Sequence, residues 1–133
     1  MVVLILSGCT QKIDKLTYTT FNEYFSKNTE YSINDTSNQY DINVRKYIEA
    51  GNGNVQIFYI EFSDSKNADK HINDIFLTDK NNKVKHSKDY TYIKNTKDKY
   101  MRLYQKDNVI VIGITYNKKY KGQVNRVLKD LGY

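Results

Sequence analysis

The run Val109-Ile110-Val111-Ile112-Gly113-Ile114 constrains the fold more than any other stretch, because it is the most apolar segment beyond residue 9. A short, continuous run of β-branched residues predicts a buried strand. We therefore expect it to be the central strand of a sheet. Within the run, Gly113 indicates either a bulge or a close backbone approach.

Alternation of apolar and polar residues predicts further strands. In residues 40–48, Ile42, Val44 and Ile48 point to one side, which is the period of a strand. The turn Gly51-Asn52-Gly53-Asn54 then leads into a second, more apolar strand, since glycine and asparagine accept positive φ. A tight turn is expected at Asp107-Asn108. Together with the central run, the expected strands are 40–48, 55–62, 90–94, 100–106 and 109–114.

Apolar residues recur at helical spacing in three segments, which we expect to be helices at 17–28, 64–77 and 118–131. The first contains Thr20-Phe21-Asn22-Glu23, which has the pattern of a capping box. Ser63-Asp64-Ser65 offers N-cap oxygens to the second. Gly132 follows the third, where a glycine commonly ends a helix. The polar segments 30–39 and 78–88 are expected to be loops.

The predicted element order is α-β-β-α-β-β-β-α. Hairpins joined by helices are typical of an α+β fold. We expect two layers, in which an antiparallel five-stranded sheet carries the helices packed on one face. A chain of 133 residues is one domain by size, and we assign residues 17–133 to it.

The N-terminus carries a short motif after an apolar run. Leu6-Ser7-Gly8-Cys9 follows Val2-Val3-Leu4-Ile5 and holds the chain's one cysteine. The motif resembles the lipobox of bacterial lipoproteins. That resemblance implies a lipid on the Cys9 thiol and cleavage just before this cysteine. The apolar run is shorter than the about 7–15 residues of a signal peptide, so residues 1–8 are interpreted as a truncated remnant. The alternative is a buried first strand with Cys9 as a small core residue.

The resemblance also implies a location. With this motif before a small domain, the chain resembles the small lipoproteins of low-GC Gram-positive bacteria. The resemblance implies that the domain is anchored at the outer face of the cell membrane. Residues 9–16 would then be the lipidated cysteine and its tether. We expect a binding or interaction module whose partners are the membrane, through the lipid, and a cell-wall polymer or a protein. No nucleic acid is expected. A single cysteine excludes an internal disulfide.

The charge is compatible with this location. Lysine and arginine number 21 against 15 acidic residues, giving a net charge of +6. A positive domain is attracted to anionic headgroups and wall polymers. The alternative is that frequent Lys, Asn, Ile and Tyr reflect an AT-rich genome.

Candidate sites are few. His71 and His86 lack the spacing of a metal site, no nucleophile motif is present, and we expect neither enzymatic activity nor a cofactor. Tyrosines are frequent, and we expect some to lie opposite the apolar face of the strands. A basic, aromatic surface there would bind sugars or anions, or nucleic acid if the domain were cytosolic, whereas the alternative is cross-strand packing. The residues of this predicted surface are Tyr47, Tyr92, Tyr100, Arg102 and Tyr104.

Overall fold

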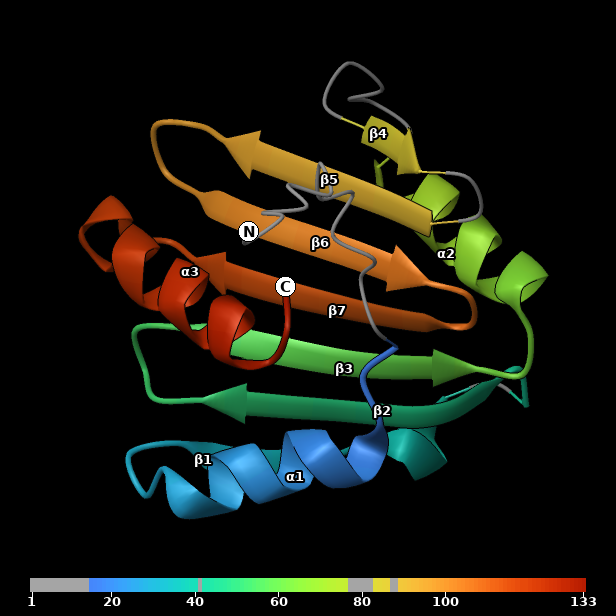
Figure 1. Ribbon diagram of the computed structural model, residues 1–133, viewed down its shortest axis with the longest axis horizontal. Helices are drawn as coiled ribbons and strands as arrows, with labels where there is room; N and C mark the ends of the chain where they lie inside the picture. Colours follow the sequence, from blue (N-terminus) through green and yellow to red (C-terminus); the bar gives the residue numbers. More distant parts are fainter. Residues whose placement is uncertain (1–14, 41, 77–82, 87–88) are drawn as a thin grey trace, which may run out of the picture.

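The computed structural model describes residues 15–40, 42–76, 83–86 and 89–133, and Figure 1 shows one antiparallel sheet with helices against it. Within these residues the sheet has seven strands, in the order β1-β2-β3-β7-β6-β5-β4. Its class is α+β, as predicted. The strands are β1 (Ser32–Asp35), β2 (Val44–Gly51), β3 (Gln56–Phe62), β4 (Lys83–His86), β5 (Asp89–Asn95), β6 (Tyr100–Lys106) and β7 (Val109–Thr115). The helices are α1 (Tyr18–Lys27), α2 (Ser65–Phe76) and α3 (Lys121–Asp130), with short 3-10 turns η1 (Ser37–Gln39) and η3 (Lys118–Tyr120).

The sheet is built from two meanders. One consists of β1, β2 and β3, the other of β4 to β7, and α2 connects them. The meanders join where β3 pairs with β7, for example at Tyr59 opposite Val111. The predicted central position of the 109–114 run is confirmed, because β7 is the fourth of seven strands.

The prediction of five strands is wrong, and so is the predicted element order. Both missed strands lie in segments that we expected to be loops, 30–39 and 78–88, and each has four residues. They are the two edges of the sheet. In β1 all four residues are exposed, so main-chain hydrogen bonds hold it and no apolar pattern marks it in the sequence.

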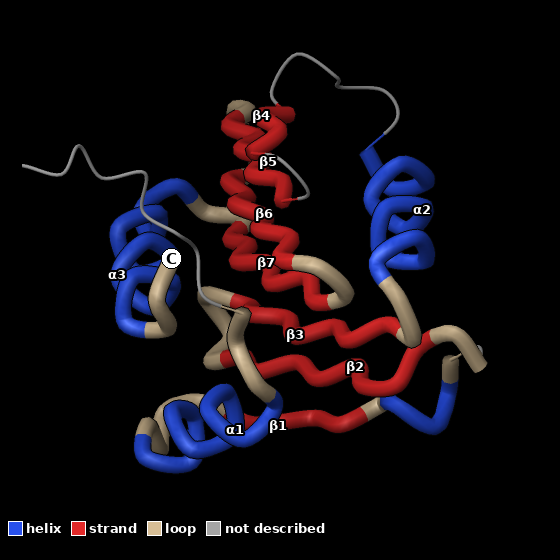
Figure 2. The backbone as a smooth tube through the Cα atoms, turned by 45° about the vertical axis from the view of Figure 1, so that its right-hand side comes forward, coloured by secondary structure: helices blue, strands red, loops and turns tan. Residues whose placement is uncertain are grey.

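The prediction that all helices pack on one face is also wrong. Helices α1 and α3 cover one face of the sheet, and α2 covers the other (Figure 2). The central strand shows why both faces are covered. Val109 and Val111 belong to the core under α1 and α3, whereas Ile110 and Ile112 belong to the core under α2. A run that is apolar at every position can only be satisfied by burial on both sides.

Gly113 marks a close approach by side chains of α3, and not the bulge or the close backbone approach that the sequence predicted, since its pairing with Ile57 and Arg102 is in register. A Cβ at this position would lie 2.8 Å from Val124 Cγ1 and 3.0 Å from Leu128 Cδ1. Both side chains come from α3 and both are fully buried. The absent side chain therefore lets α3 lie directly on β7.

Helix ends follow ordinary capping chemistry, with one correction. The N-cap of α1 is Thr17, whose Oγ1 accepts a hydrogen bond from the backbone N–H of Thr20 at 3.2 Å. The helix therefore begins before the predicted capping box at Thr20. Asp64 caps α2, because its Oδ1 accepts from the N–H of Asn67 at 2.8 Å. Gly132, with φ 103°, ends α3 as predicted.

Candidate functional site

The five residues of the predicted Tyr/Arg surface do not share one face of the sheet. Tyr47 pairs with Ile60, and Tyr92 pairs with Leu103, which places both tyrosines on the α2 side. The other three residues lie on β6 at alternate positions that face α1 and α3: Tyr100, Arg102 and Tyr104. Alternation shows which residues of one strand share a side. Which side that is depends on the register with the neighbouring strands.

Most of these side chains are also buried. Tyr92 is 2% exposed, Tyr100 4% and Tyr104 8%. On β6, Tyr100 Oη and Arg102 Nη1 both donate to Asn125 Oδ1 of α3, at 2.7 and 2.9 Å. These residues fasten a helix to the sheet. They offer no open aromatic surface on which bases or sugar rings can stack.

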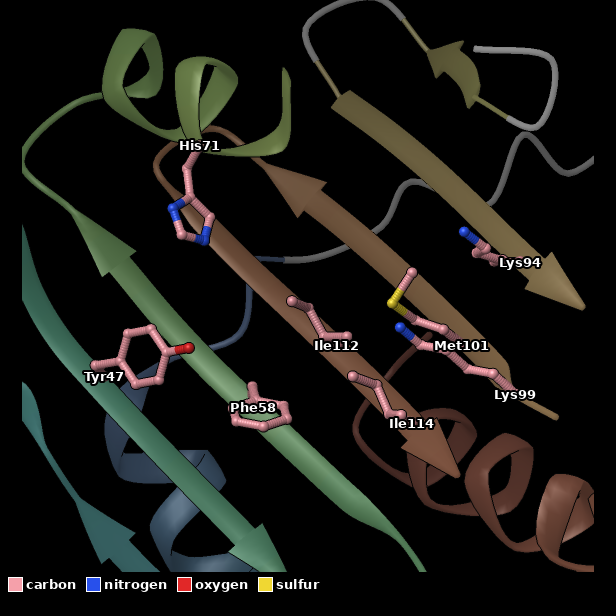
Figure 3. Close-up of a pocket in the computed structure, with 8 residues that line it drawn as sticks. All are labelled: Tyr47, Phe58, His71, Lys94, Lys99, Met101, Ile112 and Ile114. Carbon is pink, nitrogen blue, oxygen red and sulfur yellow. The ribbon is translucent and has the colours of Figure 1, made fainter. Parts of the chain in front are cut away.

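A groove does open on the α2 side of the sheet. Its volume is about 210 Å³. Helix α2 follows β3 directly and packs with Ala68 and Ile72 over one part of this face. The part of the face towards the start of β3 is left for the groove, and Figure 3 shows the side chains around it. The lining residues are Tyr47, Phe58, His71, Lys94, Lys99, Met101, Ile112 and Ile114.

The floor of the groove is apolar and comes from three neighbouring strands. Phe58 of β3 lies opposite Ile112 of β7, and Met101 of β6 lies opposite Ile114 of β7. Met101 and Ile112 are 2% and 6% exposed, while Phe58 and Ile114 are half-buried. Apolar surface that is open to water in a concave site favours an apolar ligand group.

The rim of the groove is polar and basic. Lys94 comes from β5, Lys99 from the β5–β6 turn, and His71 points from α2 towards the sheet (Figure 3). Among the described residues that line the groove, none is acidic. The field at the rim therefore favours an anionic group.

Tyr47 closes one side of the groove. Its ring stacks on that of Tyr40, with centroids 4.1 Å apart and planes 13° apart. Burial raises the pKa of the Tyr47 hydroxyl to about 12, and Tyr40 and Glu49 add to this rise. The hydroxyl therefore stays protonated near neutral pH and can donate a hydrogen bond.

The lipobox residues Leu6, Ser7, Gly8 and Cys9 lie outside the described residues. The described chain begins with Lys15, whose Nζ lies 3.8 Å from Asp107 Oδ2. Leu16 is buried, and its N–H donates to Tyr133 Oη at 3.3 Å. The polypeptide therefore joins the domain near the β6–β7 turn.

The described part of the chain shows neither a cluster of metal-ligating side chains nor a membrane-spanning helix. No three His, Cys, Asp or Glu side chains within it are placed to hold a metal ion. The helices it contains are too short or too polar to cross a membrane.

No known family model matches the chain, and no similar protein emerged from comparison with curated sequences or with solved structures.

The sequence did not point to the groove. Phe58, Met101 and Ile112 look like ordinary core residues of alternating strands, and their role depends on how much of the sheet α2 covers. One signal was present. Both faces of β3 and β7 are apolar, and the single helix between the meanders has only 12 residues to cover one of those faces.

Proposed function

We propose that this protein is a lipid-anchored binding module at the outer face of the cell membrane. The lipid is carried by Cys9, and the groove beside α2 takes a ligand with an apolar part and an anionic group. The proposal that the domain binds a ligand rests on one observation, the apolar floor of the groove. No catalytic step is assigned to the domain.

The N-terminal motif supports the anchor. Leu6-Ser7-Gly8-Cys9 matches the lipobox pattern at all four positions, and the described domain begins shortly afterwards at Lys15. Six extended residues reach at most about 20 Å. A lipid on Cys9 would therefore keep the domain close to the bilayer.

The size of the groove limits the ligand. The groove has a volume of about 210 Å³. Pockets that enclose a whole drug-sized ligand hold about 300–1,000 Å³. The groove therefore suits a short acyl chain or a single ring, and the anionic end of the ligand would remain at the rim beside Lys94 and Lys99.

Metabolic labelling tests the anchor. Cells expressing the protein are fed an alkyne fatty acid, and the wild-type chain is compared with Cys9→Ala. Label on the wild type alone supports the proposal. An unlabelled wild type, or a labelled variant, would refute it.

NMR tests the groove, and the chain offers a convenient probe because Met101 is the one methionine besides Met1. Titration with octanoate should shift the Met101 methyl resonance saturably. The double variant Lys94→Gln/Lys99→Gln should weaken the binding of octanoate and leave the binding of octanol unchanged. The matched control Lys66→Gln/Lys70→Gln on α2 should change the affinity for neither ligand. A Met101 methyl that does not respond to either ligand rules out the groove as the site.

A further inference from the structure

A second surface lies at the end of the sheet where β5 turns into β6 and where β7 leads into α3 (Figure 1). The pairing of Tyr100 with Thr115 brings these two connections together. These two connections carry five lysines and, within residues 96–99 and 116–121, one carboxylate, that of Asp98. We call this surface the basic end, and its lysines are Lys97, Lys99, Lys118, Lys119 and Lys121. Four of these lysines are exposed, and Lys99 is half-buried.

The described part of the protein does not neutralise the lysines of the basic end. Within the described residues, none of these five ammonium groups lies within 4.0 Å of a carboxylate. Three of them sit over tyrosine rings instead: Lys99 is 5.8 Å from the Tyr116 centroid, and Lys121 is 5.0 Å from that of Tyr100. Lys119 lies 5.8 Å from the ring of Tyr120. An aromatic ring attracts a cation without cancelling its charge, so the positive field extends into the solvent.

The start of α3 adds to this field. A helix N-terminus carries partial positive charge and is stabilised by acidic residues. The first turn of α3 contains no acidic residue, and Lys121 opens the helix shortly after Lys118 and Lys119, with Tyr120 between them. This arrangement destabilises the free helix end, and an anionic partner would reverse the effect.

We propose that the basic end binds an extended polymer of phosphodiester repeats without bases, of the kind found in a bacterial wall. Exposed lysines gain little from a single small anion. A polyanion that contacts several of them releases many counterions at once, and this drives binding. The basic end is spread over two chain segments, residues 97–99 and 118–121, and most of its lysines are exposed, which suits an extended chain.

The position of the basic end distinguishes the wall polymer from the lipid headgroups. This step rests on the proposed function, because it takes the membrane to lie near Lys15 at the β6–β7 turn. That turn is at the opposite end of the sheet (Figure 1). A seven-residue strand spans about 23 Å, several times the Debye length of about 8 Å at physiological salt. Headgroup charge at the Lys15 end would therefore be screened before it reached the basic end.

The aromatic residues of the basic end distinguish the polymer from nucleic acid. Binding of single strands without sequence preference relies on rings that are open for base stacking. Tyr116 is 66% exposed, but Tyr100 is buried and Tyr120 is half-buried. One open ring is a poor stacking platform, whereas the lysines contact phosphates in either polymer.

Fluorescence polarisation with labelled poly(glycerol phosphate) tests the proposal, using the full 133-residue chain with Cys9→Ser so that no lipid is present. Affinity should fall steeply with salt. Lys118→Gln/Lys119→Gln/Lys121→Gln should weaken binding about 100-fold at low salt, since each well-placed cation contributes about fivefold. The salt slope should become shallower by about 2–3. Melting temperatures confirm that both proteins are folded.

The matched control removes the same charge elsewhere: Lys66→Gln/Lys70→Gln/Lys129→Gln should bind nearly as tightly as the parent. Equal losses in the two triple variants would show a net-charge effect and overturn the basic end as the site. Equally tight binding of single-stranded DNA, or of phosphatidylglycerol vesicles through the same lysines, would overturn the choice of partner. Because this chain carries no lipid and the triple variant leaves Lys94 and Lys99 of the groove unchanged, failure here is separate from failure of the Cys9 labelling or the octanoate titration.

Discussion

Replacing Gly113 with alanine should destabilise the fold, because α3 occupies the space that the new methyl group needs. The added Cβ would lie 2.8 Å from Val124 Cγ1, 3.0 Å from Leu128 Cδ1 and 3.2 Å from Ile57 Cδ1. All three neighbours are buried and branched, so none can move without displacing others. Overpacking of this kind costs about 1–3 kcal/mol.

A smaller effect acts in the opposite direction. Alanine restricts the unfolded chain and so stabilises by about 0.4–1 kcal/mol where the backbone permits it. Gly113 is not among the glycines with positive φ, so this gain applies. We therefore expect a net loss of about 1–2 kcal/mol for Gly113→Ala, which lowers the melting temperature by about 3–10 °C.

Chemical denaturation of three further variants checks the reasoning. Val124→Ala alone should cost about 2 kcal/mol through lost burial. The double variant Gly113→Ala/Val124→Ala should be little less stable than Val124→Ala alone, because the closest clash is removed. The coupling energy between the two substitutions should therefore reach about 1 kcal/mol. Gly122→Ala is the control, since nothing lies within 4 Å of its added Cβ, and it should stabilise the helix by about 0.5–1 kcal/mol. A Gly113→Ala variant as stable as wild type, with additive effects in the double variant, would refute the close packing of α3 on β7.

Three further predictions concern caps and titration. Thr17→Ala should lower the stability by about 1 kcal/mol, because it removes the N-cap of α1. In urea titration, Thr20→Ala should show a smaller loss of stability. A larger loss for Thr20→Ala would instead support the capping box predicted from the sequence. Gly132→Ala should cost about 1 kcal/mol, because φ is 103° there, and a melting temperature that does not fall would contradict this. Burial, followed by the hydrogen bond and charge of Asp130, raises the pKa of Tyr24 to about 12, above its unfolded value of about 10. The folded state then holds its proton more tightly, so the stabilisation is fully present below about pH 10 and is lost as the pH rises towards 12. Tyr24→Phe should flatten the decline of stability in that window, and an unchanged decline would show that Tyr24 does not contribute.

Elements with strong periodicity could be predicted from the sequence. The apolar run 109–114 is the central strand, and the three helices begin and end within a few residues of the expected positions. The three helical segments have apolar residues at helical spacing, and the run 109–114 is recognised as a strand by its short length and its β-branched residues. The turn at Gly51–Asn54 was also marked, and Gly53 has φ 87° there.

The edges of the sheet and the side taken by each helix could not be predicted. The edge strands β1 and β4 leave no clear apolar pattern in the sequence. A helix with an apolar stripe can pack on either face of a sheet, and the stripe of α2 does not say which. For the same reason Tyr47 and Tyr100 were expected on one surface and lie on opposite faces. The groove depends on how far α2 extends over the sheet, which is a tertiary property. The lipobox remains a prediction from the sequence.

The pairing of β3 with β7 has a consequence for the order in which the protein can fold. Ile57 of β3 lies opposite Gly113 of β7 in the sheet. The ribosome must therefore synthesise most of the chain before the first meander can pair with β7. Until then the edge of β3 that pairs with β7 is unpaired, and both faces of the strand carry exposed apolar side chains. Unpaired strand edges and exposed apolar surface of this kind promote aggregation during synthesis. Native contacts between such distant positions also slow folding. The nascent protein would thus stay unfolded, or depend on chaperones, until its last strand emerges.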